Sequence, residues 1–99
     1  MSDEIRASHI LVDTKSRTKE EAQKAIEGIV SDLQNGGTFE KLAEEHSDCP
    51  SGSNGGDLGS FGKGAMVPEF EEAAFNLEIG ETSDAVETSF GIHLIHRTE

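Results

Sequence analysis

Apolar and polar side chains alternate along the segment Ile5–Val12, near the start of the chain. Successive side chains of a strand point to opposite faces, so this alternation predicts a β-strand. Both faces become apolar toward Val12, which indicates a central strand covered on both sides. His9 then lies on an otherwise apolar face. The two faces carry Ile5, Ala7, His9 and Leu11, and Arg6, Ser8, Ile10 and Val12.

Three later segments have apolar residues at helical spacing. The first helix is predicted to begin at a capping box, Thr18 with Glu21, and to end at Gly36. Thr38 is a suitable cap for the second helix, and Pro68 suits the first turn of the third, whose helical region is predicted to end by Gly80. The apolar stripes are Ala22, Ala25, Ile26, Ile29, Val30 and Leu33; Phe39, Leu42 and Ala43; and Val67, Phe70, Ala73, Ala74 and Leu77.

Three further strands are predicted. One is short and lies around Leu58–Phe61, and two form a hairpin, Ala85–Thr88 and Gly91–Arg97, joined by a tight turn. The segment Ser47–Asn54 contains three serines together with Asp, Cys, Pro and Gly, and it is predicted to be a loop. The order of strand, two helices, strand, helix and hairpin predicts a small α+β domain that occupies residues 1–99, with helices packed on one sheet.

The charge of the chain narrows the choice of partners. Among 99 residues, 20 are acidic and 8 are basic, giving a formal net charge of −12. Such a surface repels nucleic acid and anionic lipid, and it suits a basic partner or a salty environment.

Neither a secretory leader nor a run of 18 apolar residues is visible, and the single Cys49 fits a reducing compartment. The cytoplasm is therefore the expected location.

Four residues could take part in chemistry: His9, Cys49, Thr88 and His93. A cysteine and a histidine can form a nucleophilic pair, but the sequence shows no acidic residue placed to orient the histidine. Two histidines and a cysteine can also bind zinc, yet no two of them are closely spaced, as zinc ligands usually are. No metal and no cofactor is therefore predicted.

A glycine-rich stretch predicts an apolar pocket. Residues 55–62 contain four glycines, which let the backbone bend and leave room for a ligand to approach. Leu58 and Phe61 interrupt this stretch, and Met66 and Phe70 follow at the start of the third helix. Together they are predicted to form one wall of the pocket.

Several motifs, in order along the chain, resemble the parvulin family of peptidyl-prolyl cis/trans isomerases. The similarity covers essentially the whole chain, and it implies a parvulin-like four-stranded antiparallel sheet surrounded by four helices, with a shallow groove for an Xaa-Pro bond. The motifs are Ala7-Ser8-His9-Ile10-Leu11-Val12; Phe39-x-x-Leu42-Ala43 with Ser47-Asp48-Cys49; Gly56-Asp57-Leu58-Gly59-x-Phe61; Met66-Val67-Pro68-x-Phe70-Glu71-x-Ala73-x-Phe75; and Gly80-Glu81-x-Ser83 with Phe90-Gly91-Ile92-His93-Leu94-Ile95.

The resemblance also implies roles for individual residues. It implies a monomeric enzyme that isomerises proline-containing polypeptides without covalent chemistry and assists protein folding as a chaperone. A parvulin fold that binds proline-containing chains without turnover remains an alternative, although a pure binder would not need the whole catalytic set. The implied catalytic residues are His9, Cys49, Thr88 and His93, and the implied proline pocket is Leu58, Met66 and Phe70, with Phe61 and Phe90 nearby.

The loop after the first strand bears on substrate preference. The phosphate-directed branch of the family carries a basic cluster in this loop. Here Lys15 and Arg17 are the candidate phosphate contacts, but Asp13 opens the loop with the opposite charge and an adjacent pair of arginines is missing. We therefore expect non-phosphorylated substrates with an apolar or basic residue before proline.

Overall fold

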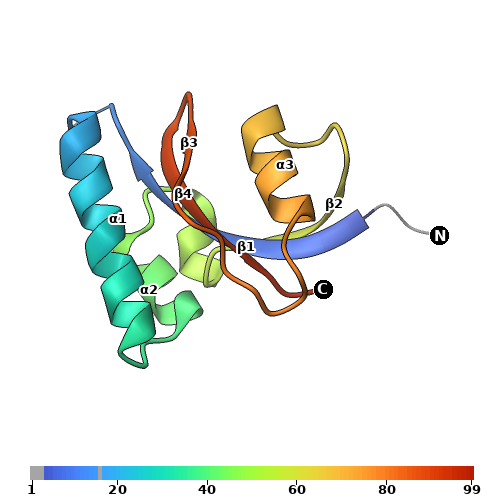
Figure 1. The fold of residues 1–99 in the computed structure, drawn as a ribbon, viewed down its shortest axis with the longest axis horizontal. Helices are drawn as coiled ribbons and strands as arrows, with labels where there is room; N and C mark the ends of the chain where they lie inside the picture. The colour runs from blue at the N-terminus through green and yellow to red at the C-terminus, as the bar shows by residue number, and fades with distance from the viewer. Residues whose placement is uncertain (1–3, 16) are drawn as a thin grey trace.

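The structure, a computed structural model, describes residues 4–15 and 17–99. Within them the chain forms four strands, three α-helices and one 3₁₀ turn (Figure 1). The elements are β1 (Glu4–Asp13), α1 (Lys19–Gln34), α2 (Phe39–His46), the 3₁₀ turn η1 (Pro50–Asn54), β2 (Asp57–Gly62), α3 (Pro68–Phe75), β3 (Val86–Thr88) and β4 (Gly91–Arg97).

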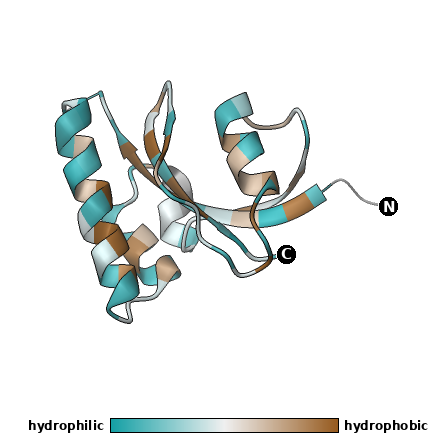
Figure 2. Cartoon of the chain, viewed as in Figure 1, coloured by the Kyte–Doolittle hydropathy of each residue, from teal (hydrophilic) through white to brown (hydrophobic). Residues whose placement is uncertain are grey.

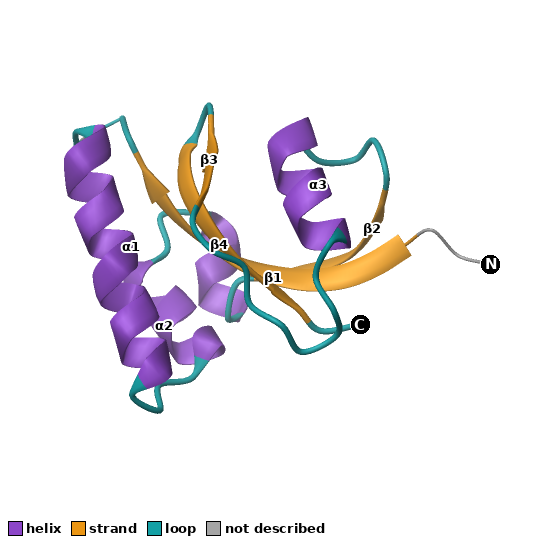
Figure 3. Ribbon diagram, in the orientation of Figure 1, coloured by secondary structure: helices purple, strands orange, loops and turns teal. Residues whose placement is uncertain are grey.

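The strands form one antiparallel sheet in the order β2-β1-β4-β3 (Figure 3). The two longest strands, β1 and β4, therefore lie at its centre, as the two-sided pattern of β1 predicts. Their register places His9 opposite Ile95 and Leu11 opposite His93. Because side chains alternate between faces, both histidines point to the same side of the sheet.

The helices divide between the two faces of the sheet. Helices α1 and α2 cover one face, and α3 covers the other (Figures 1 and 2). Each face has its own apolar core, because alternate residues of β1 and β4 point to opposite sides. The core on the α1 and α2 side includes Ile10, Val12, Ile26, Ile29, Phe39, Leu42, Ile92 and Leu94, and the core on the α3 side includes Ile5, Ala7, Phe61, Phe70, Ala74, Leu77 and Ile95.

The predicted helix starts are confirmed. The Thr18 hydroxyl accepts a hydrogen bond from the Glu21 N–H at 3.2 Å, and the Glu21 carboxylate accepts one from the Thr18 N–H at 2.8 Å. These reciprocal bonds satisfy N–H groups that lack partners inside the helix. The Thr18 N–H also lowers the pKa of the Glu21 carboxyl. The Thr38 hydroxyl caps α2 by accepting a hydrogen bond from the Lys41 N–H at 3.4 Å, and Pro68 occupies the first turn of α3.

Two expectations need correction. The α+β class and the four-stranded sheet are confirmed, but the fourth expected helix is only the 3₁₀ turn η1, within the segment predicted to be a loop. The residues of η1, Pro-Ser-Gly-Ser-Asn, have low helix propensity, so they form only a short 3₁₀ turn. Helix α3 ends at Phe75 rather than near Gly80. Leu77, just beyond its end, is still buried in the same core.

Among the described residues, no helix has the length and apolar character needed to cross a membrane.

Candidate active site

Two buried histidines form the centre of the candidate site. His9 of β1 and His93 of β4 are only 5% and 4% exposed. Their rings stack with centroids 5.3 Å apart, and their Nδ1 atoms are 3.1 Å apart, within hydrogen-bond distance. Phe70 of α3 presents its ring edge-to-face to both imidazoles, at 5.5 Å from His9 and 5.3 Å from His93. This packing fixes the orientation of both rings.

The burial of the two imidazoles determines their protonation. Desolvation lowers the pKa of His9 to about 4, and desolvation together with repulsion from His9 lowers the pKa of His93 to about 4. Both rings are therefore neutral near pH 7. For two neutral rings to share this hydrogen bond, one Nδ1 must carry a hydrogen and donate the bond, and the other Nδ1 must accept it. The choice of donor ring sets the tautomers of both histidines together.

Thr88 connects this pair to the β3–β4 turn. Its hydroxyl oxygen lies 2.8 Å from Nε2 of His93 and accepts a hydrogen bond from the Phe90 N–H at 3.2 Å. When the Thr88 hydroxyl donates to Nε2, Nδ1 of His93 carries the proton; in the other tautomer Nε2 donates to Thr88. The hydroxyl hydrogen of Thr88 is thus coupled to the histidine tautomers.

An apolar cavity of about 370 Å³ opens above the histidines. Met66, Val67 and Phe70 form its α3 side, and Phe90, which is 51% exposed, stands at its rim. A cavity with mostly apolar walls and a few polar groups at one place is typical of a small-ligand site. The lining residues are His9, Leu11, Cys49, Leu58, Ala65, Met66, Val67, Phe70, Phe90 and His93.

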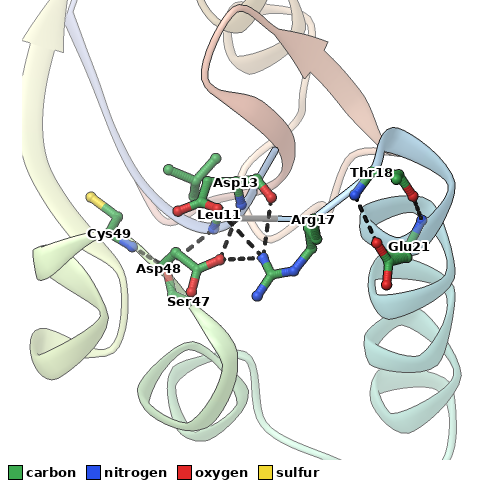
Figure 4. A network of polar contacts seen from close by, with 8 residues as sticks. All are labelled: Leu11, Asp13, Arg17, Thr18, Glu21, Ser47, Asp48 and Cys49. Atoms are coloured by element: carbon green, nitrogen blue, oxygen red, sulfur yellow. Dashed lines mark hydrogen bonds and ion pairs between the residues drawn. The ribbon is translucent and has the colours of Figure 1, made fainter. Parts of the chain in front are cut away.

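The Cys49 wall is attached to β1 by hydrogen bonds (Figure 4). The Asp48 N–H donates to the Leu11 carbonyl at 2.7 Å. The Ser47 hydroxyl accepts from the N–H of Leu11 at 3.1 Å and from the N–H of Cys49 at 3.3 Å. These bonds hold Cys49, which is half-buried, beside Leu11 at the edge of the cavity.

Gly56, just before β2, allows the chain to approach β1 closely beside His9. Its carbonyl accepts a hydrogen bond from the His9 N–H at 2.9 Å, and its φ of +82° lies in the left-handed region that favours glycine. A Cβ at this position would collide with the His9 carbonyl oxygen. The glycine-rich stretch therefore serves close approach of β2 to His9, and Leu58 reaches the cavity two residues later.

The sequence matches the family described as the PPIC-type PPIase domain over residues 1–99. The chain belongs to this family, the parvulins. It is 52% identical over 96 residues to the foldase protein PrsA of Geobacillus kaustophilus, covering 96% of this chain and 31% of that protein. It is 39% identical over 114 residues to the peptidyl-prolyl cis-trans isomerase Pin1 of Arabidopsis thaliana, covering 97% of this chain and 96% of that protein.

Solved structures agree with this assignment. The solution structure of NmPin, the parvulin of Nitrosopumilus maritimus, matches with a TM-score of 0.78 and 43% identity, covering all of this chain and 99% of that one. The parvulin fold predicted from the motifs is therefore confirmed. The chain spans only 27% to 32% of the length of the PrsA relatives.

The structure brings most of the predicted parvulin site together. His9, His93, Cys49 and the predicted pocket residues Leu58, Met66, Phe70 and Phe90 all line the one cavity. Thr88 is not among the described residues that line it, and it reaches the site through His93. Phe61 also lies outside the lining. It is 5% exposed, pairs in register with Ile5 and packs behind Phe70, with the two ring centroids 6.1 Å apart.

Sequence reasoning did not assign three of the lining residues, Leu11, Ala65 and Val67. A signal for Leu11 was present, because it shares a strand face with His9 and so extends the same wall. Ala65 and Val67 flank Met66 in the approach to α3, where no periodic pattern marks the residues that face the cavity.

The two candidate phosphate contacts have different surroundings. Arg17 donates from Nη1 to the Asp48 carboxylate at 2.6 Å and to the Asp13 carbonyl at 3.1 Å. Its guanidinium is thus already held by the protein itself (Figure 4). Lys15 is exposed on the same loop.

The zinc alternative finds no support in the geometry. Within residues 4–15 and 17–99, no group of three or more His, Cys, Asp or Glu side chains is arranged to hold a metal ion. His9 and His93 instead bond to one another through Nδ1.

Proposed function

We propose that this domain isomerises Xaa-Pro peptide bonds of polypeptides between cis and trans without forming a covalent intermediate. The observation that carries this proposal is an apolar cavity bordered by a neutral, mutually hydrogen-bonded histidine pair. Family membership supports the same reaction, and the Pin1 relative is named as a peptidyl-prolyl cis-trans isomerase.

The reaction needs a site that prefers the twisted amide. Rotation about a peptide bond costs about 18–20 kcal/mol because the twisted state loses amide resonance. The cis and trans forms of an Xaa-Pro bond differ by only about 0.5–1 kcal/mol, so a catalyst needs only to stabilise the state between them. No bond has to be broken.

In this proposal, apolar walls hold the proline ring. Met66, Phe70 and Leu58 contact the ring, and the same walls keep water from the amide. Water stabilises the planar amide, which is more charge-separated than the twisted one, so its exclusion lowers the barrier. Fixing the ring also leaves the preceding carbonyl as the part that rotates.

Cys49, which lines the cavity, would face that rotating carbonyl. Thr88 is coupled to the histidine pair, which lines the same cavity. His9 and His93 act in this scheme by fixing the orientation of Thr88 and the local field. Both are neutral near pH 7, which suits a role in positioning rather than in charge stabilisation.

For the substrate we propose non-phosphorylated chains with an apolar or basic residue before proline. The net charge of −12 favours basic segments over acidic ones. Arg17, one of the two candidate phosphate contacts, is engaged by Asp48.

We further propose that the domain assists folding of client proteins, as a monomer in the cytoplasm. The PrsA relatives are named as foldases, which supports a role on unfolded chains.

Ile79 and Phe90 are the only large apolar side chains exposed among the described residues, so no broad apolar surface there calls for a partner subunit. Light scattering tests the monomer, and fractionation of source cells tests the compartment.

A protease-coupled isomerisation assay tests the central proposal. Peptides with Leu, Arg, Glu or phosphoserine before proline are compared at low and high salt. We expect turnover of Leu-Pro and Arg-Pro peptides, with the Arg-Pro advantage shrinking at high salt because screening weakens attraction to the acidic surface. Binding of these peptides without any acceleration would identify a binding module instead.

A further inference from the structure

Residues 13, 14 and 17, at the end of β1 and in the loop to α1, are hydrogen-bonded to residues that line or adjoin the cavity. The Thr14 N–H donates to the carbonyl of Phe90 at 3.3 Å. The Asp13 N–H donates to the Asp48 carboxylate at 3.0 Å, and the backbone of Asp48 bonds to Leu11. Leu11, Phe90 and Cys49, the neighbour of Asp48, all line the cavity. With proline bound in the cavity as proposed above, residues 13–15 and 17 border the neighbouring part of the substrate chain.

In this loop the guanidinium of Arg17 is bonded to groups of the protein itself. Arg17 Nη1 is 2.6 Å from Asp48 Oδ2, 3.1 Å from the Asp13 carbonyl and 3.7 Å from the Asp13 carboxylate (Figure 4). The Arg17 and Asp48 side chains are 31% and 29% exposed, so the pair is partly shielded from solvent. Asp48 belongs to the segment after α2, which means that the pair joins parts of the chain 31 residues apart.

The electrostatics of this cluster favour the ion pair between Arg17 and Asp48. The hydrogen bond to Asp48 raises the pKa of Arg17, so its charge is secure. Burial raises the pKa of Asp48, but the bonds from Arg17 and the Asp13 N–H outweigh it and leave the pKa lowered. Two carboxylates surround one guanidinium, so the cluster carries a net negative charge. A substrate anion would have to compete with Asp48 for Arg17.

From this geometry we infer that Asp48 is a specificity-determining residue: it holds Arg17 against the protein, so that the cavity rejects anionic residues next to the bound proline. The inference rests on the proposed isomerase function. It assigns the rejection to a named carboxylate rather than to the overall acidity of the surface.

The test is the ratio of kcat/KM for a Glu-Pro peptide to that for a Leu-Pro peptide. In Asp48→Asn the ion pair is weakened and Arg17 becomes available, so the ratio should rise about two- to fivefold, the range that a partly exposed ion pair supplies. A phosphoserine-Pro peptide should gain at least as much. The gain should fall at high salt and disappear in Asp48→Asn combined with Arg17→Met.

Asp57→Asn provides a matched control. Asp57 pairs with Arg6 at the same distance, 2.6 Å, and the side chains of Asp57 and Arg6 are 32% and 44% exposed, but neither residue lines the cavity. Loss of this pair should leave the Glu-Pro to Leu-Pro ratio unchanged. Urea unfolding of each variant separates a change in the folded fraction from a change in preference, and the ratio itself is insensitive to that fraction.

Arg17→Met alone gives an independent test. Since Arg17 is engaged by Asp48 in the wild-type protein, its removal should lower the ratio only through the added net negative charge of Asp13 and Asp48, and this fall should disappear at high salt. A fall that persists at high salt would mean that Arg17 already contacts substrate and would overturn the inference. An unchanged ratio in Asp48→Asn, or a gain that persists without Arg17, would overturn it as well. Failure of the wild-type protein to turn over any peptide would instead contradict the proposed function.

Discussion

On the face of the sheet covered by α1 and α2, side chains of β1 and β4 are close-packed, whereas on the face covered by α3 the same two strands border an open cavity. Ile10 and Leu94 on the first face are fully buried. His9 and His93, one position away along each strand, meet the cavity of about 370 Å³. Alternation along two strands thus gives one closed face and one face that carries both an apolar core and the candidate binding cavity.

The comparison shows how a small domain can carry a costly site. The buried imidazoles lose their hydration, which the hydrogen bonds between them and to Thr88 replace, whereas the open apolar cavity forgoes packing. The closed face offsets this with fully buried aliphatic side chains, each contributing roughly 1.5–3 kcal/mol on burial. Changes on the two faces should therefore separate stability from activity, except where one residue serves both.

Phe70 is such a residue, and its truncation should have the largest effect. Phe70→Ala removes a ring that is 3% exposed, lines the cavity and packs edge-to-face on both histidines. We expect a loss of about 3–5 kcal/mol in the free energy of unfolding and of most of the isomerase activity of the remaining folded protein. Urea unfolding and the protease-coupled assay measure the two losses. Full activity per folded molecule would show that the cavity is not the proline site.

Ile26→Ala should affect stability alone. Ile26 of α1 is 1% exposed and belongs to the closed face. Its truncation should cost about 2–5 kcal/mol of unfolding free energy by leaving a cavity in the core. The value of kcat/KM, corrected for the folded fraction, should stay close to that of the wild type. A large loss in this corrected value would mean that the two faces are not separable.

Acid should lower the free energy of unfolding through the two buried histidines of the open face. The folded-state pKa of each is lowered to about 4, below the ordinary value of 6.5, so the unfolded chain takes up protons first as the pH falls. Their contribution to stability is complete above pH 6.5 and is lost progressively down to pH 4. At pH 5 the loss should be about 1–2 kcal/mol per histidine.

Comparison with His93→Asn isolates this effect from the carboxylates. The variant keeps the same acidic residues but has one fewer imidazole, so its unfolding free energy should fall less between pH 7 and pH 5. Equal falls in the two proteins would contradict neutral burial of His93. Activity of the wild type should not change between pH 6.5 and pH 8, because both rings stay neutral throughout.

Local patterns could predict most of the architecture. The alternation of β1 placed His9 and Leu11 on one face, and the capping box fixed the start of α1. The meeting of His9 with His93 could not be read in this way, because the residues are 84 positions apart and no local pattern specifies the β2-β1-β4-β3 order. The resemblance to the parvulins, rather than periodicity, indicated that these two histidines form a pair.

Phe61 shows where pattern and resemblance both fell short. In a regular strand, Leu58 and Phe61 would point to opposite faces. The register of β2 against β1 shifts between Arg6 and Ser8, and Gly59 has a φ of +72°. This irregularity brings both side chains to the α3 side, where Phe61 enters the core and Leu58 reaches the cavity. The sequence shows the glycine but not the shift.

Replacement of Cys49 should have the smallest effect. Cys49 lines the cavity beside Leu11, and amide rotation needs no bond to its sulfur. Cys49→Asp should therefore keep a substantial part of kcat/KM for a Leu-Pro peptide, with Cys49→Ser as a size-matched comparison. A nucleophilic or proton-transferring thiol would instead predict a loss of about 10²-fold or more. A folded but inactive Cys49→Asp protein would contradict the non-covalent scheme, and the urea transition of the same sample shows whether it is folded.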